Sequence, residues 1–176
     1  MGAEGSERKL IREAQRGSRG ALAALYERHW ERAQRAAYLV VHDAAAAEDI
    51  AQEAFMSALR ALDRFDRRRP LGPWLHRIVV NRAIDWARAR SLRREISESP
   101  GAEDFDTGDL GTFSDGVGAG LASLSPEHRA VIVMRYLLDY TPGEIADLLD
   151  LPRGTVNSRL RRGLDRLEEL IDREHR

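Results

Sequence analysis

The sequence predicts an all-α protein of two helical domains joined by a flexible acidic linker. Apolar residues recur at steps of three and four over residues 21–94 and 125–172, which is the spacing of helices that bury one face. We find no convincing strand pattern in the chain. A segment rich in glycine, serine and aspartate lies between the two parts, and this composition favours disorder. We therefore expect domains at 1–94 and 121–176 and a linker at 95–120.

Three helices are expected in the first domain. Ser18 and Asp43 suit the N-caps of the first two, because short polar side chains there accept hydrogen bonds from the first backbone amides. Pro73 suits the first position of a third helix that continues to about residue 94. Residues 63–72 interrupt the periodicity and predict a basic loop.

The second domain is expected to contain a helix-turn-helix. Ser125 suits the N-cap of its first helix, and Thr141-Pro-Gly-Glu144 has the form of a capping box that opens a short second helix. Asp150 follows at the position where such a turn needs a left-handed residue. A last helix over about 154–172 completes the motif.

Composition argues against an enzyme, a metalloprotein and a membrane protein. The 176 residues include no cysteine, which excludes disulfides, thiolate metal sites and thiol nucleophiles. The five histidines are scattered, and no glycine-rich phosphate loop is present. No apolar run is long enough to span a membrane, and the polar N-terminus does not resemble a signal peptide. We expect no catalytic residue, metal or cofactor, no membrane span and a cytoplasmic location.

The net charge of −1 conceals a strong asymmetry along the chain. Residues 58–94 contain eleven arginines and three aspartates, whereas residues 95–127 contain eight acidic residues and no lysine or arginine. A second basic cluster, five arginines against one aspartate, occupies residues 151–166. Two separated basic clusters suggest two contacts with a polyanion.

The start of the last helix has the residue types of a DNA recognition helix. Val156 is expected to pack inward, which leaves polar side chains on or beside the exposed face: Arg153, Thr155, Asn157, Ser158, Arg159, Arg161 and Arg162. Arginine suits guanine, asparagine suits adenine, and hydroxyl groups suit phosphate. The alternatives are a solvated basic face and a helix pair that contacts protein.

A second candidate surface combines the basic loop with the third helix. The polar residues of that helix fall at steps of four, four and three and so share a face: Arg77, Asn81, Asp85 and Arg88. Trp74 lies at the head of this stripe, beside Arg67, Arg68 and Arg69. Basic groups with an aromatic platform suit a single nucleic-acid strand whose bases are unstacked. The alternatives are a core role for Trp74 and a solvated arginine loop.

An acidic stripe lies on the predicted second helix. Asp49, Gln52 and Glu53 project from the face opposite the apolar residues Ile50 and Ala54. Folding does not require such a stripe, and it would suit a basic partner helix. The alternative is that acidic residues here compensate the helix dipole.

Two long segments resemble one family, the extracytoplasmic-function (ECF) class of bacterial sigma factors. LSPEHRAVIVMRYLLDYTPGEIADLLDLPRGTVNSRLRRGLDRLEEL resembles domain four of that class, and ALYERHWERAQRAAYLVVHDAAAAEDIAQEAFMSALRALDRFDRRRPLGPWLHRIVVNRAIDWAR resembles domain two. They cover roughly two-thirds of the chain in the family's order. The resemblance implies a subunit that binds core RNA polymerase, directs it to promoters and helps to open the duplex.

The resemblance also implies roles for particular segments. Domain four would read the −35 element in the major groove, through residues that match the family's motif: Arg153, Thr155, Asn157, Ser158, Arg159 and Arg162. Domain two would read and melt the −10 element through FDRRRPLGPWLHRIVVNRAID. The segment DAAAAEDIAQEAFMSAL resembles the family's contact with the clamp helices of the polymerase's largest subunit. An anti-sigma factor is a further partner that the family suggests.

Two other functions remain open from sequence alone. A sigma-like decoy would bind an anti-sigma factor without reading DNA, and the retained arginines argue against it. A conventional helix-turn-helix repressor or activator would not explain the first helical domain.

Overall fold

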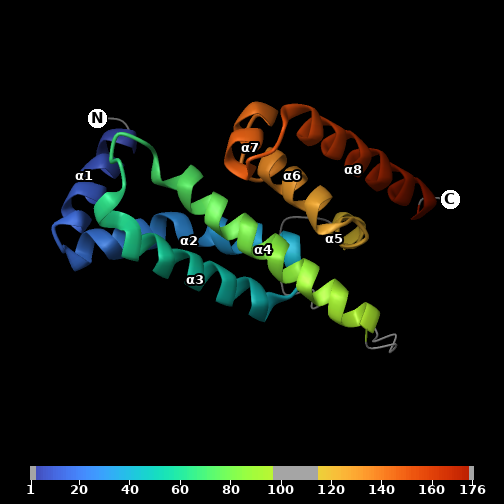
Figure 1. Ribbon diagram of the computed structural model, residues 1–176, viewed down its shortest axis with the longest axis horizontal. Coiled ribbons are helices and arrows are strands. Elements are labelled where there is room, and N and C mark those ends of the chain that lie inside the picture. The colour runs from blue at the N-terminus through green and yellow to red at the C-terminus, as the bar shows by residue number, and fades with distance from the viewer. Residues whose placement is uncertain (1–2, 97–114, 175–176) are drawn as a thin grey trace.

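The computed structural model describes residues 3–96 and 115–174, and these two ranges are helical without a strand. The prediction of an all-α fold is confirmed. The first range, here called the N-terminal module, contains α1 (Ala3–Gln15), α2 (Arg19–Val41), α3 (Ala44–Ala61), the 3-10 turn η1 (Leu62–Arg64) and α4 (Leu71–Ile96). The second range, the C-terminal module, contains α5 (Asp115–Ala122), α6 (Pro126–Tyr136), α7 (Pro142–Leu149) and α8 (Arg153–Glu174) (Figure 1).

The caps expected from sequence are present. The side chains of Ser18 and Asp43 accept hydrogen bonds from the backbone amides three residues further on, at 3.3 and 2.9 Å. Thr141 and Glu144 form the complete capping box, with the Glu144 carboxylate accepting from the Thr141 amide at 2.7 Å. Asp150 has the left-handed conformation, with a φ of 54°.

Three element boundaries differ from the sequence predictions. The polar N-terminus forms helix α1, which periodicity alone did not reveal. Helix α4 begins at Leu71, so Pro73 is its third residue rather than its first. This is tolerated because the first backbone amides of a helix have no acceptor within it. Helix α5 occupies the end of the segment expected to be linker, and residues 97–114 of that segment lie outside the described residues.

The N-terminal module is built on α2, α3 and α4, which pack against one another lengthwise (Figure 1). Val40, Leu75 and Val79 are fully buried between these helices. Helix α1 packs on the start of α2 and on η1, where Ile11 is fully buried in a smaller cluster of its own.

In the C-terminal module, α8 packs against α5, α6 and α7. Val156 of α8 and Ile145 of α7 are both fully buried at the helix-turn-helix crossing. Two glycines allow close approach: a Cβ at Gly163 would lie 2.7 Å from Ile132 Cδ1, and one at Gly120 would lie 2.8 Å from Leu167 Cδ2.

The two modules pack against each other through α6, which lies on both α2 and α4 (Figure 1). Every residue from 129 to 134 is buried, because α8 covers one side of α6 and the N-terminal module covers the other. Polar contacts reinforce the interface: the Arg32 guanidinium lies 2.6 Å from the Asp139 carboxylate and 2.9 Å from the Leu137 carbonyl oxygen. Helical periodicity in the sequence does not predict this packing.

Candidate nucleic-acid and polymerase interfaces

The start of α8 presents a polar, positively charged face. Val156 and Leu160 point into the module, and the remaining candidate residues are exposed (Arg153, Asn157, Arg161, Arg162) or half-buried (Thr155, Ser158, Arg159). The left-handed Asp150 turns the chain so that α8 starts four residues after α7 ends. Among the described residues, no carboxylate pairs with any of these four arginines. Their charge is therefore available to a ligand.

This face remains open although the modules are packed together. Helix α8 contacts other helices of the C-terminal module, and α6 lies between it and the N-terminal module (Figure 1). A nucleic acid could therefore approach the start of α8 without any rearrangement of its own module.

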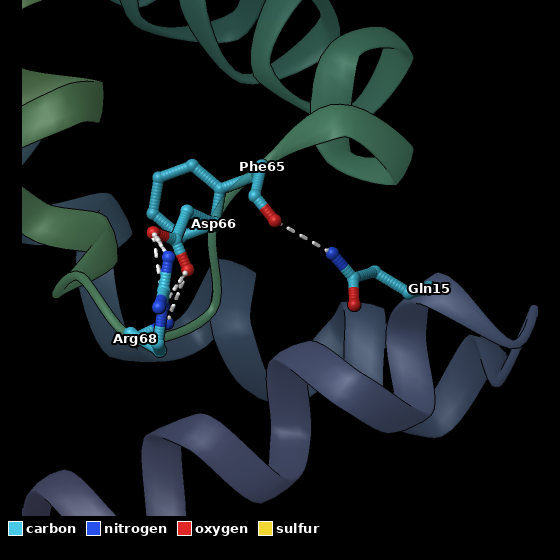
Figure 2. A network of polar contacts seen from close by, with 4 residues as sticks. All are labelled: Gln15, Phe65, Asp66 and Arg68. Atoms are coloured by element: carbon cyan, nitrogen blue, oxygen red, sulfur yellow. Dashed lines mark hydrogen bonds and ion pairs between the residues drawn. The ribbon is translucent and has the colours of Figure 1, made fainter.

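The basic loop between η1 and α4 exposes all three of its consecutive arginines. Arg68 folds back on Asp66, which accepts hydrogen bonds from the Arg68 amide at 3.0 Å and from its guanidinium at 3.0 Å (Figure 2). These bonds lower the pKa of Asp66 to about 2. No ion pair involves Arg67 or Arg69 in the described part of the chain, so two of the three cations have no carboxylate partner.

Helix α1 supports this loop. The Gln15 side-chain amide donates to the carbonyl oxygen of Phe65 at 2.9 Å (Figure 2) and to that of Leu62 at 3.0 Å. The Glu7 carboxylate accepts a hydrogen bond from the Leu71 backbone amide at 3.3 Å. It thereby supplies an acceptor for the first amide of α4. Neither Gln15 nor Glu7 was predicted from the sequence to have a role. The available signal was the apolar group Leu10, Ile11 and Ala14, which is short and surrounded by charge.

Trp74 is half-buried beneath the loop and not freely exposed. Its ring stacks on Phe65 with centroids 4.7 Å apart, and it contacts both apolar clusters of the N-terminal module. This placement corresponds to the core role that the sequence left open as an alternative. The side chain fixes the base of the loop that carries the arginines.

The polar stripe of α4 lies partly against the C-terminal module. Arg77 and Asp85 are exposed, and Asn81 is half-buried. Arg88 Nε lies 2.5 Å from Glu127 Oε1 on α6, so this arginine is part of the contact between modules. This pairing could not be predicted from the sequence because it joins residues 39 positions apart.

The acidic stripe on α3 is exposed at all three positions, Asp49, Gln52 and Glu53. Glu53 accepts from Arg82 at 2.7 Å, and Gln52 donates to the neighbouring Glu48 carboxylate at 3.1 Å. Exposed ion pairs of this kind contribute about 0–1 kcal/mol, so a partner could replace them at little cost.

Two further properties bear on function. Among the described residues, no three histidines, aspartates or glutamates gather as metal ligands. Within the same ranges, no helix combines the length and the apolar character needed to cross a membrane.

A buried histidine, His76, and a half-buried one, His42, lie where the modules meet. His76 Nδ1 lies 2.7 Å from the hydroxyl oxygen of Tyr140, across the interface. Burial, together with the nearby His29 and Arg32, lowers the pKa of His76 to about 4. Burial and the charge of Arg129 likewise lower the pKa of His42 to about 4. Both rings are therefore neutral in the folded protein at pH 7.

Acidification should therefore destabilise the fold. The pKa of His76 rises from about 4 to its ordinary 6.5 on unfolding, so the unfolded chain binds the proton first and stability falls as pH decreases from 6.5 towards 4. Between pH 7.5 and pH 5 this histidine should account for a loss of about 2 kcal/mol. Urea unfolding at both pH values, with His76→Asn beside the parent chain, measures it. Equal losses in the two proteins would contradict the assignment.

Comparisons with known proteins agree with the architecture. Residues 25–93 match the family model described as Sigma-70 region 2, and residues 120–169 match Sigma-70, region 4. The ECF RNA polymerase sigma factor SigL of Mycobacterium tuberculosis is 34% identical over 145 residues, covering 79% of this chain and 82% of that protein. SigW of Bacillus subtilis, also named an ECF RNA polymerase sigma factor, is 28% identical over 93% of this chain and 96% of its own.

A solved structure extends the similarity to three dimensions. CnrH, whose structure is known in complex with the cytosolic domain of CnrY, superposes with a TM-score of 0.70 at 29% identity, covering 94% of this chain and 97% of CnrH. The two matched regions, in this order and on these helices, show that the chain belongs to the ECF group of the sigma-70 family and is an RNA polymerase sigma factor.

Proposed function

We propose that this sigma factor recognises a two-part promoter with two separate surfaces. The start of α8 reads the −35 element in the major groove, and the basic loop with the exposed stripe of α4 contacts the −10 element as a single strand. The observation that carries the proposal is the set of exposed arginines without carboxylate partners at the start of α8, on a helix-turn-helix. A recognition helix contacts base edges with this N-terminal part.

The proposed roles of domains two and four correspond to the N-terminal and C-terminal modules, respectively. Domain two corresponds to 1–94 and domain four to 121–176, and the acidic segment 95–120 joins them. Promoter elements two helical turns apart, each turn about 34 Å, require the surfaces to be well separated. Arg88 can contact DNA only after its pair with Glu127 breaks, and movement of the modules away from each other would free it.

The acidic stripe of α3 is proposed to contact the clamp helices of the polymerase's largest subunit. Its carboxylates are exposed. With basic residues of the partner they would mainly speed association and fix the relative position of the two surfaces. The chemistry of RNA synthesis then belongs to the polymerase, and the sigma factor acts as an initiation factor in the cytoplasm.

An anti-sigma factor is a proposed additional partner. CnrH, which is similar over nearly the whole chain, binds the cytosolic domain of another protein. The decoy alternative has less support, because a protein that only binds an anti-sigma factor has no need of the exposed arginines on α8.

Transcription from a random promoter pool tests the proposal directly. Core RNA polymerase with the purified chain is expected to produce run-off transcripts from templates enriched in two short elements at a fixed spacing. Core polymerase alone serves as the control. Transcripts without enrichment, or no gain over core polymerase alone, would refute promoter recognition.

A double charge reversal tests the polymerase contact. Asp49→Arg with Glu53→Arg should weaken association with core polymerase at least tenfold, because two attractive contacts become repulsive. The second change also replaces the ion pair with Arg82 by two like charges, which pushes the new side chain outward towards the partner. Co-purification and fluorescence anisotropy measure the change.

The matched control is Glu27→Arg with Glu31→Arg, two exposed carboxylates at the same spacing on α2. This variant has the same net charge as the test variant and should bind core polymerase like the parent chain. Equal weakening in both variants would show that overall charge, and not the α3 stripe, governs association.

A further inference from the structure

A pocket of about 460 Å³ lies at the junction of the two modules. Its walls come from the end of α2, from the second half of α4, and from the α5–α6 connection with the first turn of α6. Trp86, Leu124 and Pro126 supply apolar wall. The volume falls within the range of about 300–1,000 Å³ that small-molecule sites occupy.

Arg129 lines this pocket and is a buried cation without a partner. Its side chain belongs to a residue only 8% exposed, and its Nε has no hydrogen-bond partner among the described residues. Burial lowers the pKa of Arg129 to about 10, so the guanidinium is still charged at pH 7. The nearest acidic influence is Glu127, whose carboxylate is already bonded to Arg88. A buried charge of this kind is costly unless an anion compensates it.

The remaining charges around the pocket have the same sign. Arg90 and Arg94 also line it, and none of the lining residues is an aspartate or glutamate. Arg90 is paired with Asp43 at 2.6 Å, and its guanidinium lies 5.1 Å from the centre of the Trp86 ring. Arg94 is exposed at the rim and forms no ion pair within the described ranges. Three guanidinium groups thus surround one cavity, and only one of them, that of Arg90, forms an ion pair with a carboxylate.

We propose that this pocket is a binding site for a small anion that bears phosphate groups, held by Arg129 inside and Arg94 at the rim. Arginine suits phosphate because its planar group donates two parallel hydrogen bonds to neighbouring oxygens. Such an anion would supply the missing acceptor for Arg129 and balance the local positive charge. None of the residues that line this site belongs to the DNA and polymerase surfaces proposed above.

Occupancy would favour the packed arrangement of the modules. The pocket exists only where the N-terminal module supplies Arg94 and the C-terminal module supplies Arg129. A ligand that binds one arrangement and not the other shifts the population towards the arrangement that it binds. Because packing also engages Arg88, bound anion would oppose promoter contact by that residue.

Calorimetric titration of the full chain with inorganic pyrophosphate at constant ionic strength tests the site. Saturable binding of one pyrophosphate per chain is expected. Arg94→Gln should weaken binding roughly tenfold, the effect of one charge-assisted hydrogen bond. Arg129→Met should abolish it, and this apolar side chain of similar length avoids leaving an empty space.

The matched control is Arg93→Gln, since Arg93 is equally exposed on the same helix but does not line the pocket. Its affinity should equal that of the parent chain. Arg94→Gln alters an exposed residue, so it remains informative if Arg129→Met fails to fold. Absence of saturable binding, or equal weakening by Arg93→Gln and Arg94→Gln, would overturn the proposal.

A distance measurement tests the effect on the modules. The chain has no cysteine, so Arg60→Cys on α3 and Glu168→Cys on α8 place one fluorescent label on each module. In the urea range where the modules separate, pyrophosphate should increase the short-distance population, and Arg94→Gln should reduce that response. An unchanged population at saturating pyrophosphate would refute the coupling.

Discussion

Arg153→Glu is expected to abolish promoter-directed transcription while leaving association with core polymerase intact. Arg153 is the first residue of α8, it is exposed, and no carboxylate in the described ranges pairs with it. Loss of one bidentate base contact costs about 1–3 kcal/mol, and a carboxylate in its place also repels phosphate. A promoter-specific complex therefore loses at least tenfold in affinity, whereas the fold loses no internal contact.

The control for this reversal is Arg166→Glu on the same helix. Arg166 lies more than three turns beyond Arg153, and its guanidinium lies 3.1 Å from the Glu169 carboxylate. The overall charge changes equally in the two variants, but only Arg153 lies at the proposed base contact. Run-off transcription and DNA binding at two salt concentrations measure both. Normal initiation by Arg153→Glu would contradict the role of α8 in reading DNA.

Local features of the fold could be predicted from sequence because they depend on neighbouring residues. The caps at Ser18, Asp43 and Thr141 each use a side chain that bonds an amide three residues away. The left-handed turn at Asp150 likewise follows from its place between two periodic segments. These interactions leave a direct trace in the residue order.

Contacts between distant segments could not be predicted in the same way. Helix α1 has only a short apolar face, and Ile11 is buried by residues from α2, η1 and α4. One feature of the sequence does indicate that the modules pack together. Residues 130–134 form a continuous apolar run, which is typical of a helix covered on more than one side.

The candidate functional residues show the same contrast between local features, which could be predicted, and long-range contacts, which could not. Residue type and helical spacing identified side chains that are indeed exposed on α8, on the basic loop and on α3. Pairing could not be predicted, because Arg88 and Glu53 find their partners on other helices. The position of Trp74 against Phe65 also depends on how the loop folds over the core. Which of these side chains meets DNA or polymerase stays a prediction.

Ile11→Ala should destabilise the protein by about 2–5 kcal/mol, the usual cost of truncating a fully buried large aliphatic side chain. Such a loss is a substantial fraction of the roughly 5–15 kcal/mol that typically stabilises a domain. Leu10→Ala is the matched control, because Leu10 is only half-buried on the same helix and should lose less. Urea unfolding measures both. A loss below about 1 kcal/mol in Ile11→Ala would show that α1 contributes little to the fold.

The same substitution should loosen the basic loop before the module unfolds. Helix α1 holds the two ends of that loop, through Gln15 to the carbonyl of Phe65 and through Glu7 to the amide of Leu71. When Ile11 no longer anchors α1, both bonds weaken, and the backbone around the exposed arginines becomes flexible enough to fit the active site of trypsin. Faster cleavage after Arg67 and Arg68 under native conditions is therefore expected in Ile11→Ala, and also in Gln15→Ala, which removes one tether without touching the apolar cluster. The bond after Arg69 precedes Pro70 and resists trypsin. Cleavage at the parent rate in both variants would show that the loop keeps its shape without α1, and the helix would then act only through the apolar contacts of Ile11.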